Sequence, residues 1–67
     1  MTTVTVNGES QDLEGPTTVA DLVALVGAGP KGVAVALNEE VVARSRWAAT
    51  PIRAGDRIEV LTAAQGG

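Results

Sequence analysis

The chain has 67 residues, 45% of them hydrophobic, and Trp47 is its one aromatic residue, so it can form a single small domain with an aliphatic core. It has no cysteine and no histidine, which excludes disulfides, thiolate metal ligands, a thiol nucleophile and the commonest acid–base group at neutral pH. Eight acidic against five basic side chains give a net charge of −3, which argues against nucleic acid or an anionic membrane as a partner.

A β-hairpin over Thr2 to Leu13 is the first predicted element. Its sequence, TTVTVNGESQDL, has valines alternating with threonines before Asn7-Gly8, the dipeptide that most readily forms a type I′ turn. The alternation puts Val4 and Val6 on one face, and we expect only that face to be buried.

A helix follows in TVADLVALVG, where apolar residues recur at helical spacing. The predicted buried stripe consists of Val19, Leu22, Val23 and Val26. Thr18 and Asp21 predict a capping box at the start, and Gly27 predicts a left-handed residue after the end.

The second half of the chain predicts further strands. VAVAL, residues 33–37, has Val33, Val35 and Leu37 on one side and small alanines on the other, so both faces can be covered, and this predicts a central strand. A turn at Asn38-Glu39 leads to a short strand at Val41-Val42. SRWAAT predicts a helical turn capped by Ser45 and ended by Pro51.

The last predicted strand runs from Arg57 to Leu61, after a turn at Gly55-Asp56. The segment before VAVAL is long enough to cross over between parallel strands. The predicted fold is therefore α+β, a β-grasp domain over residues 1–61 with a mixed sheet of about five strands and one crossing helix. Residues 62–67 are predicted to form a flexible tail that ends in Gly-Gly.

The tail is the first candidate site. Six small residues reach roughly 20 Å beyond the sheet, far enough to enter a partner's active site. Gly66 and Gly67 lack Cβ atoms and can pass a narrow constriction. The alternative interpretation of the tail is a frayed end without function. The carboxylate of Gly67 is ionised at neutral pH and needs activation from outside, most simply by adenylylation with ATP.

Leu61 is the second candidate. The alternation places its side chain on the face of the sheet opposite to that of Ile58 and Val60, just before the tail begins. We interpret it either as a partner contact or as one harmless apolar residue on the surface.

The remaining candidates have simpler interpretations. Trp47 is expected to pack in the core or at its edge, although an indole can also stack on ligands. The arginines are expected to be solvated, with a partner site as the alternative; they are Arg44, Arg46, Arg53 and Arg57. Glycines at 27, 29 and 32 only loosely resemble a phosphate-binding loop, since they follow a helix instead of a strand.

Three segments of the chain resemble the ThiS family, the ubiquitin-like sulfur carriers of thiamine biosynthesis. They are NGE with TVADLV, then VAVALNEEVVARSRWA, and finally GDRIEVLTAAQGG. The middle one is the most specific, since Asn38, Val42, Arg44 and Trp47 are similar to the family's run alN-x-x-vvpRs-x-W. Ala43 departs from that run, where proline is common, and this affects a turn and not the chemistry.

The resemblance implies a function for the tail. A ThiF-like adenylyltransferase would bind the sheet face and adenylylate Gly67 with MgATP, and a sulfur donor such as a cysteine desulfurase would convert the adenylate to a thiocarboxylate. Thiazole synthase, a ThiG-like enzyme, would then take the sulfur, with Gly66 and Gln65 leading Gly67 into the partner. The protein would thus be a cosubstrate and not an enzyme, with no bound cofactor or metal.

Other interpretations remain open from the sequence. A MoaD-like carrier for molybdopterin synthesis shares the β-grasp fold and the Gly-Gly ending. A passive interaction subunit would bury its tail in a partner without any change that depends on ATP. Without a signal-like opening or an apolar run of about 18 to 20 residues, we expect a cytoplasmic protein.

Overall fold

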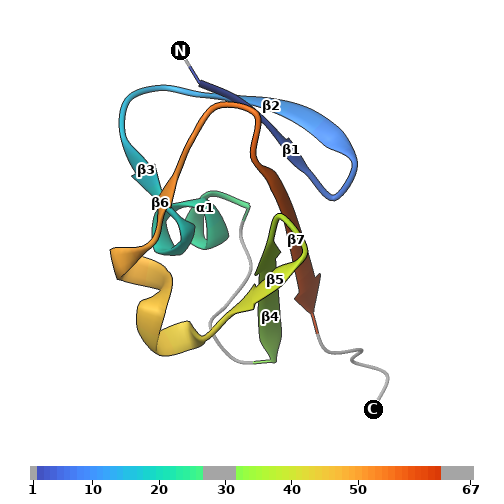
Figure 1. The fold of residues 1–67 in the computed structure, drawn as a ribbon, viewed down its shortest axis with the longest axis vertical. Helices are drawn as coiled ribbons and strands as arrows, with labels where there is room; N and C mark the ends of the chain where they lie inside the picture. The colour runs from blue at the N-terminus through green and yellow to red at the C-terminus, as the bar shows by residue number, and fades with distance from the viewer. Residues whose placement is uncertain (1, 27–31, 63–67) are drawn as a thin grey trace.

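A computed structural model of the chain describes residues 2–26 and 32–62, which form one five-stranded sheet, a second sheet of two short strands and two helices (Figure 1). The strand order in the large sheet is β2-β1-β7-β4-β5. The strands of this sheet are β1 (Thr2–Val6), β2 (Glu9–Leu13), β4 (Val33–Leu37), β5 (Glu40–Val42) and β7 (Arg57–Thr62).

The middle position belongs to β7, which pairs in parallel with β1 and antiparallel with β4. Each of these partners also forms an antiparallel hairpin with the strand that follows it, β1 with β2 and β4 with β5. The segment between β2 and β4 therefore joins two strands that run in the same direction, as predicted. This mixed sheet with one α-helix confirms the β-grasp fold.

Both hairpin turns use residues with positive φ. Asn7 and Gly8 have φ values of 51° and 84°, as a type I′ turn requires, so the prediction from Asn-Gly is confirmed. The second turn has Asn38 at 52° and Glu39 at 75°. Asparagine enters this region several times more readily than most residues, whereas glutamate does so only under local constraint.

Helix α1 (Val19–Leu25) begins at the predicted capping box. The Thr18 hydroxyl accepts from the Asp21 N–H at 3.2 Å, and the Asp21 carboxylate accepts from the Thr18 N–H at 3.0 Å. Val26 caps the other end and is 40% exposed, so the prediction that it joins the buried stripe was wrong. The cap predicted at Gly27 lies outside the described residues. Across the two described segments, no helix is long and apolar enough to span a membrane.

A second, two-stranded sheet was not predicted. It consists of β3 (Thr17–Thr18) and β6 (Pro51–Ile52), and it holds the start of α1 beside the end of the 3₁₀ helix η1 (Arg44–Ala49). The Val19 N–H donates to the Thr50 carbonyl at 2.9 Å in the same place. Strands of two residues are too short to show the alternation by which a strand is recognised, so no sequence pattern indicates them.

The start of η1 also differs from expectation. Ser45 lies inside the helix, while Ala43 occupies the N-cap position and makes no side-chain cap bond. The prediction of a Ser45 cap was therefore wrong. The helix is instead fixed by tertiary packing, since Trp47 is buried and its indole N–H donates to the Val42 carbonyl at 3.0 Å.

The core lies between α1 and one face of the large sheet. Leu22 and Val19 of α1 are fully buried there with Ile58 of β7, and Val35 of β4 is 1% exposed. The β4 strand is internal, as predicted, but Ala34 on its other side is exposed. Both faces of this strand could be covered, but α1 covers only the one that carries Val35.

Candidate functional site

The C-terminal end of β7 presents an apolar side chain on the face of the sheet opposite the core, here called the open face. Leu61 is 62% exposed, while Ile58 and Val60 on the core side are 0% and 8% exposed, so the predicted alternation is confirmed. The strand runs through Thr62, the residue that we expected to begin the tail. In Figure 1, this end of β7 points away from the β3–β6 pair.

Small side chains surround Leu61 on the open face. Ala34 lies directly opposite it across the β4–β7 ladder, and Ala36 lies between Glu59 and Val41 in the neighbouring row. Val41 is 81% exposed. We call Ala34, Ala36, Val41 and Leu61 the Leu61 patch. Because the alanines end at Cβ, a partner can approach the sheet closely and enclose the side chains of Leu61 and Val41.

Charged residues lie beside the Leu61 patch. The Arg57 guanidinium pairs with the Glu39 carboxylate at 2.6 Å, with both side chains more than half exposed. Glu59 lies between Arg57 and Leu61 along β7, on the same face. An apolar patch with a polar border is the usual anatomy of a protein contact surface.

Two asparagine side chains hold β7 from its two sides. The Asn7 Oδ1 accepts from the Val60 N–H at 2.8 Å, and the Asn7 Nδ2 donates to the Val60 carbonyl at 3.2 Å. At the start of the strand, the Asn38 Oδ1 accepts from the Arg57 N–H at 2.9 Å and its Nδ2 donates to Asp56 at 3.0 Å. The sequence identified both residues as turn formers but not as partners of β7, because the bonds depend on which strands become neighbours.

The tail residues of the predicted site, Gln65, Gly66 and Gly67, lie outside the described residues. The structure therefore locates the last residues of β7 and the surface around them. Leu61 is the one predicted site residue that it places.

The other candidates take the simpler interpretations. Trp47 is 6% exposed and belongs to the core, as expected. The four arginines are all exposed, also as expected, and Arg57 forms an ion pair with Glu39. Of the three glycines of the loop, Gly32 is described, with a φ of 69°, and the other two lie outside the described segments.

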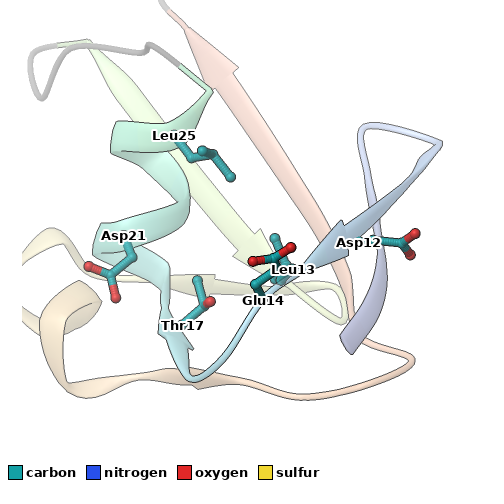
Figure 2. Close-up of a pocket in the computed structure, with 6 residues that line it drawn as sticks. All are labelled: Asp12, Leu13, Glu14, Thr17, Asp21 and Leu25. Atoms are coloured by element: carbon teal, nitrogen blue, oxygen red, sulfur yellow. The ribbon is translucent and has the colours of Figure 1, made fainter. Parts of the chain in front are cut away.

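A hollow of about 440 Å³ lies between the end of β2 and α1 (Figure 2). It is lined by Asp12, Leu13, Glu14, Thr17, Asp21 and Leu25. Figure 2 shows Leu25 pointing from α1 toward Leu13, while the Asp12 carboxylate points away from the helix. Among residues 2–26 and 32–62, no three acidic side chains are arranged to hold a metal ion. The hollow thus offers carboxylates, a hydroxyl and two leucines, without a set of converging groups that would support catalysis.

Comparison with known proteins gives consistent matches over nearly the whole chain. The model of the ThiS family matches residues 4–67. The sulfur carrier protein ThiS of Thermus thermophilus is 42% identical over 64 residues, which cover 96% of this chain and 98% of that protein.

Solved structures agree with the sequence matches. The crystal structure of the thiamine biosynthesis protein ThiS from Geobacter metallireducens superimposes with a TM-score of 0.80 and is 37% identical, covering 97% of this chain and 99% of that one. An NMR structure of a thiamine biosynthesis protein from the same organism gives a TM-score of 0.82 at 32% identity, with 97% and 87% of the two chains covered.

Proposed function

This chain belongs to the ThiS family of sulfur carrier proteins, and we propose that it carries sulfur for thiamine biosynthesis as a thiocarboxylate on Gly67. The observation that carries the proposal is the family match, which extends over the final Gly66-Gly67 and over the strand that leads to them. Five residues follow β7, a reach of up to about 17 Å. That length is enough to bring Gly67 into a partner's active site while the domain stays outside.

The proposed chemistry has two steps. A carboxylate oxygen of Gly67 attacks the α-phosphorus of MgATP in a ThiF-like adenylyltransferase, and pyrophosphate leaves. Hydrosulfide then attacks the acyl carbon and displaces AMP. With a cysteine desulfurase as the donor, the outer sulfur of its persulfide attacks in the same way, and a thiol then reduces the resulting S–S bond to release the thiocarboxylate. The first step is needed because a free carboxylate is a poor electrophile, while an acyl-adenylate has a good leaving group.

We further propose that the Leu61 patch is the surface by which the adenylyltransferase recognises the carrier. Leu61 lies one residue before the end of β7, so a partner that covers it is also positioned to receive the residues that follow. Its 62% exposure leaves most of its apolar surface available for burial in a complex. The neighbouring charges of Arg57 and Glu59 would then set the orientation of the complex.

A thiazole synthase of the ThiG type is the proposed acceptor of the sulfur. In this scheme the carrier is a cosubstrate of both partners and supplies no catalytic group, which agrees with a chain that has no histidine and no cysteine. The matches to ThiS favour this scheme over the alternative of a MoaD-like carrier in molybdopterin synthesis.

The test is a mass measurement on the intact protein. Incubation with a ThiF-like enzyme, MgATP and sulfide should replace one oxygen by sulfur and add about 16 mass units, confined to the C-terminal peptide. Omission of ATP should prevent the change. Added mass in another peptide, or without nucleotide, would contradict a thiocarboxylate on Gly67.

Deletion of Gly67 is the matched control for this experiment. It should abolish the added mass and leave the unfolding midpoint essentially unchanged, since residues 2–26 and 32–62 already form a sheet and a buried core in the described part of the chain. A truncated protein that still gains the mass would show that Gly67 is not the modified residue.

A further inference from the structure

The bonds between β1 and β7 change from backbone to side chain at the end of their pairing. The backbone pairs Thr5 with Arg57 and Val6 with Ile58, and the Asn7 N–H donates to the Ile58 carbonyl at 2.9 Å. The chain then leaves the ladder at the Asn7-Gly8 turn. The next position along β7 is Val60, and there the Asn7 side chain binds both the N–H and the carbonyl, at 2.8 and 3.2 Å.

An asparagine amide can replace a backbone rung because it carries the same groups as a peptide unit, one carbonyl acceptor and N–H donors. Aspartate has the acceptor without the donor, and glycine has neither. The positive φ of Asn7, 51°, belongs to the region that asparagine tolerates better than most residues. Asn7 therefore combines a positive φ with an amide that can replace a peptide unit.

The hydrogen bonds from the Asn7 side chain to Val60 lie two residues before the end of β7. Up to Val60, β7 is bonded on both sides, to β4 on one side and to β1 or Asn7 on the other. Leu61 and Thr62 continue to pair with β4, opposite Ala34 and Val33. Among the described residues, the Asn7 amide is therefore the last group bonded to β7 on its β1 side before the strand ends.

We propose that Asn7 is a positioning residue for the modification of Gly67. By fixing the backbone of Val60, its amide sets the direction of the last two residues of β7, Leu61 and Thr62, so that the Leu61 patch and Gly67 can engage one partner together. This assignment rests on the proposed function. A group that holds a reacting segment in line reduces the conformational freedom that must be lost in the active site.

Asn38 provides a matched control. It also has a positive φ, 52°, and its amide also makes two hydrogen bonds, one of them to the backbone of β7. That bond is to Arg57, the first residue of β7, at the opposite end of the strand from Leu61 and Thr62. Glycine at either position tolerates the backbone conformation and removes the amide, so Asn7→Gly and Asn38→Gly should cost similar stability.

The experiment compares initial rates of thiocarboxylate formation for these two variants and the wild-type protein, at several carrier concentrations. We expect both variants to lower the melting temperature by a similar amount, about 4 to 8 °C. Only Asn7→Gly should reduce kcat/KM for the carrier, by about tenfold. Amide hydrogen exchange should accelerate at Val60 in Asn7→Gly and at Arg57 in Asn38→Gly.

Asn7→Asp is the conservative variant, and it also serves if Asn7→Gly fails to fold. It retains the acceptor for the Val60 N–H and lacks the donor to the Val60 carbonyl, so its kcat/KM should lie between those of wild type and Asn7→Gly. If Asn7→Gly does not fold, an Asn7→Asp rate below that of Asn38→Gly supports the assignment.

The failures of the two proposals are distinguishable. Normal conversion of the wild-type protein with equal rates for the Asn7 and Asn38 variants would overturn the role of Asn7 alone. No conversion of the wild-type protein would overturn the modification of Gly67 and, with it, the positioning role.

Discussion

The two faces of β7 contrast sharply in what they contact. On the core face, Ile58 is fully buried and Val60 is 8% exposed, packed with the aliphatic side chains of α1. On the open face, Leu61 is 62% exposed and has an alanine as its neighbour across the ladder. One strand of six residues thus provides both the centre of the core and an apolar surface that no described residue covers.

This contrast teaches that apolar residues of one strand can have separate roles. A core side chain stabilises the fold through burial, whereas an exposed one contributes little until a partner covers it. Changes on the core face should therefore reduce stability. Changes on the open face should reduce partner binding and leave stability almost unchanged.

Ile58→Ala should produce the largest loss of stability, and it tests the difference between the two faces most directly. Removal of a fully buried side chain leaves a cavity, and we expect a loss of about 2 to 5 kcal/mol in the free energy of unfolding, measured by denaturant titration. The matched control Leu61→Ala should change it by less than about 0.5 kcal/mol. Equal losses in the two variants would mean that the open face contributes to folding as much as the core.

Leu61→Arg should produce the next largest effect, on binding alone. If the Leu61 patch anchors the adenylyltransferase, the complex should weaken by about 2 to 4 kcal/mol, measured by calorimetric titration, as for other buried apolar anchors. The unfolding midpoint should not move.

Leu25→Arg is the control for Leu61→Arg, because Leu25 is 65% exposed but lies on α1, away from the open face. We expect it to bind the adenylyltransferase like wild type. If both arginine variants bound equally well, Leu61 would be an ordinary surface residue, and the open face would have no role in binding the adenylyltransferase.

Glu39→Gln should have the smallest effect. It removes the ion pair with Arg57 on the open face, and exposed pairs contribute at most about 1 kcal/mol to stability. The difference in free energy of unfolding from wild type should vanish at high salt, where such pairs are screened. A loss of stability above about 1 kcal/mol that persisted at high salt would contradict this expectation. It would mean that this pair stabilises the fold more than two exposed side chains should.

The sequence predicted the fold largely through local patterns. The Asn7-Gly8 turn, the Thr18–Asp21 capping box and the alternation of β7 each depend on residues close together in the chain, and each is confirmed. The resemblance to the ThiS family came from short motifs of the same kind, and the family match confirms it.

The features that were missed or wrong depend on distant residues. The pairing of β3 with β6 and the binding of Asn7 to Val60 arise only when segments from opposite ends of the chain become neighbours. Ser45 has the right side chain for a cap, but the packing of Trp47 fixes η1 two residues earlier than a Ser45 cap would. Tertiary contacts override local preference in such cases.

The central place of β7 also determines when the fold can form during synthesis. β7 is the last strand that the structure describes, and both hairpins of the large sheet pair with it instead of with each other. A nascent chain that has not yet released β7 from the ribosome has two hairpins without a common partner, and the Val6–Ile58 pairing joins residues that are far apart in the sequence. Formation of the large sheet therefore requires that β7 has been synthesised and released. Because the Leu61 patch combines side chains of β4, β5 and β7, only chains that include β7 display it, and a partner that binds this surface discriminates against chains truncated before β7.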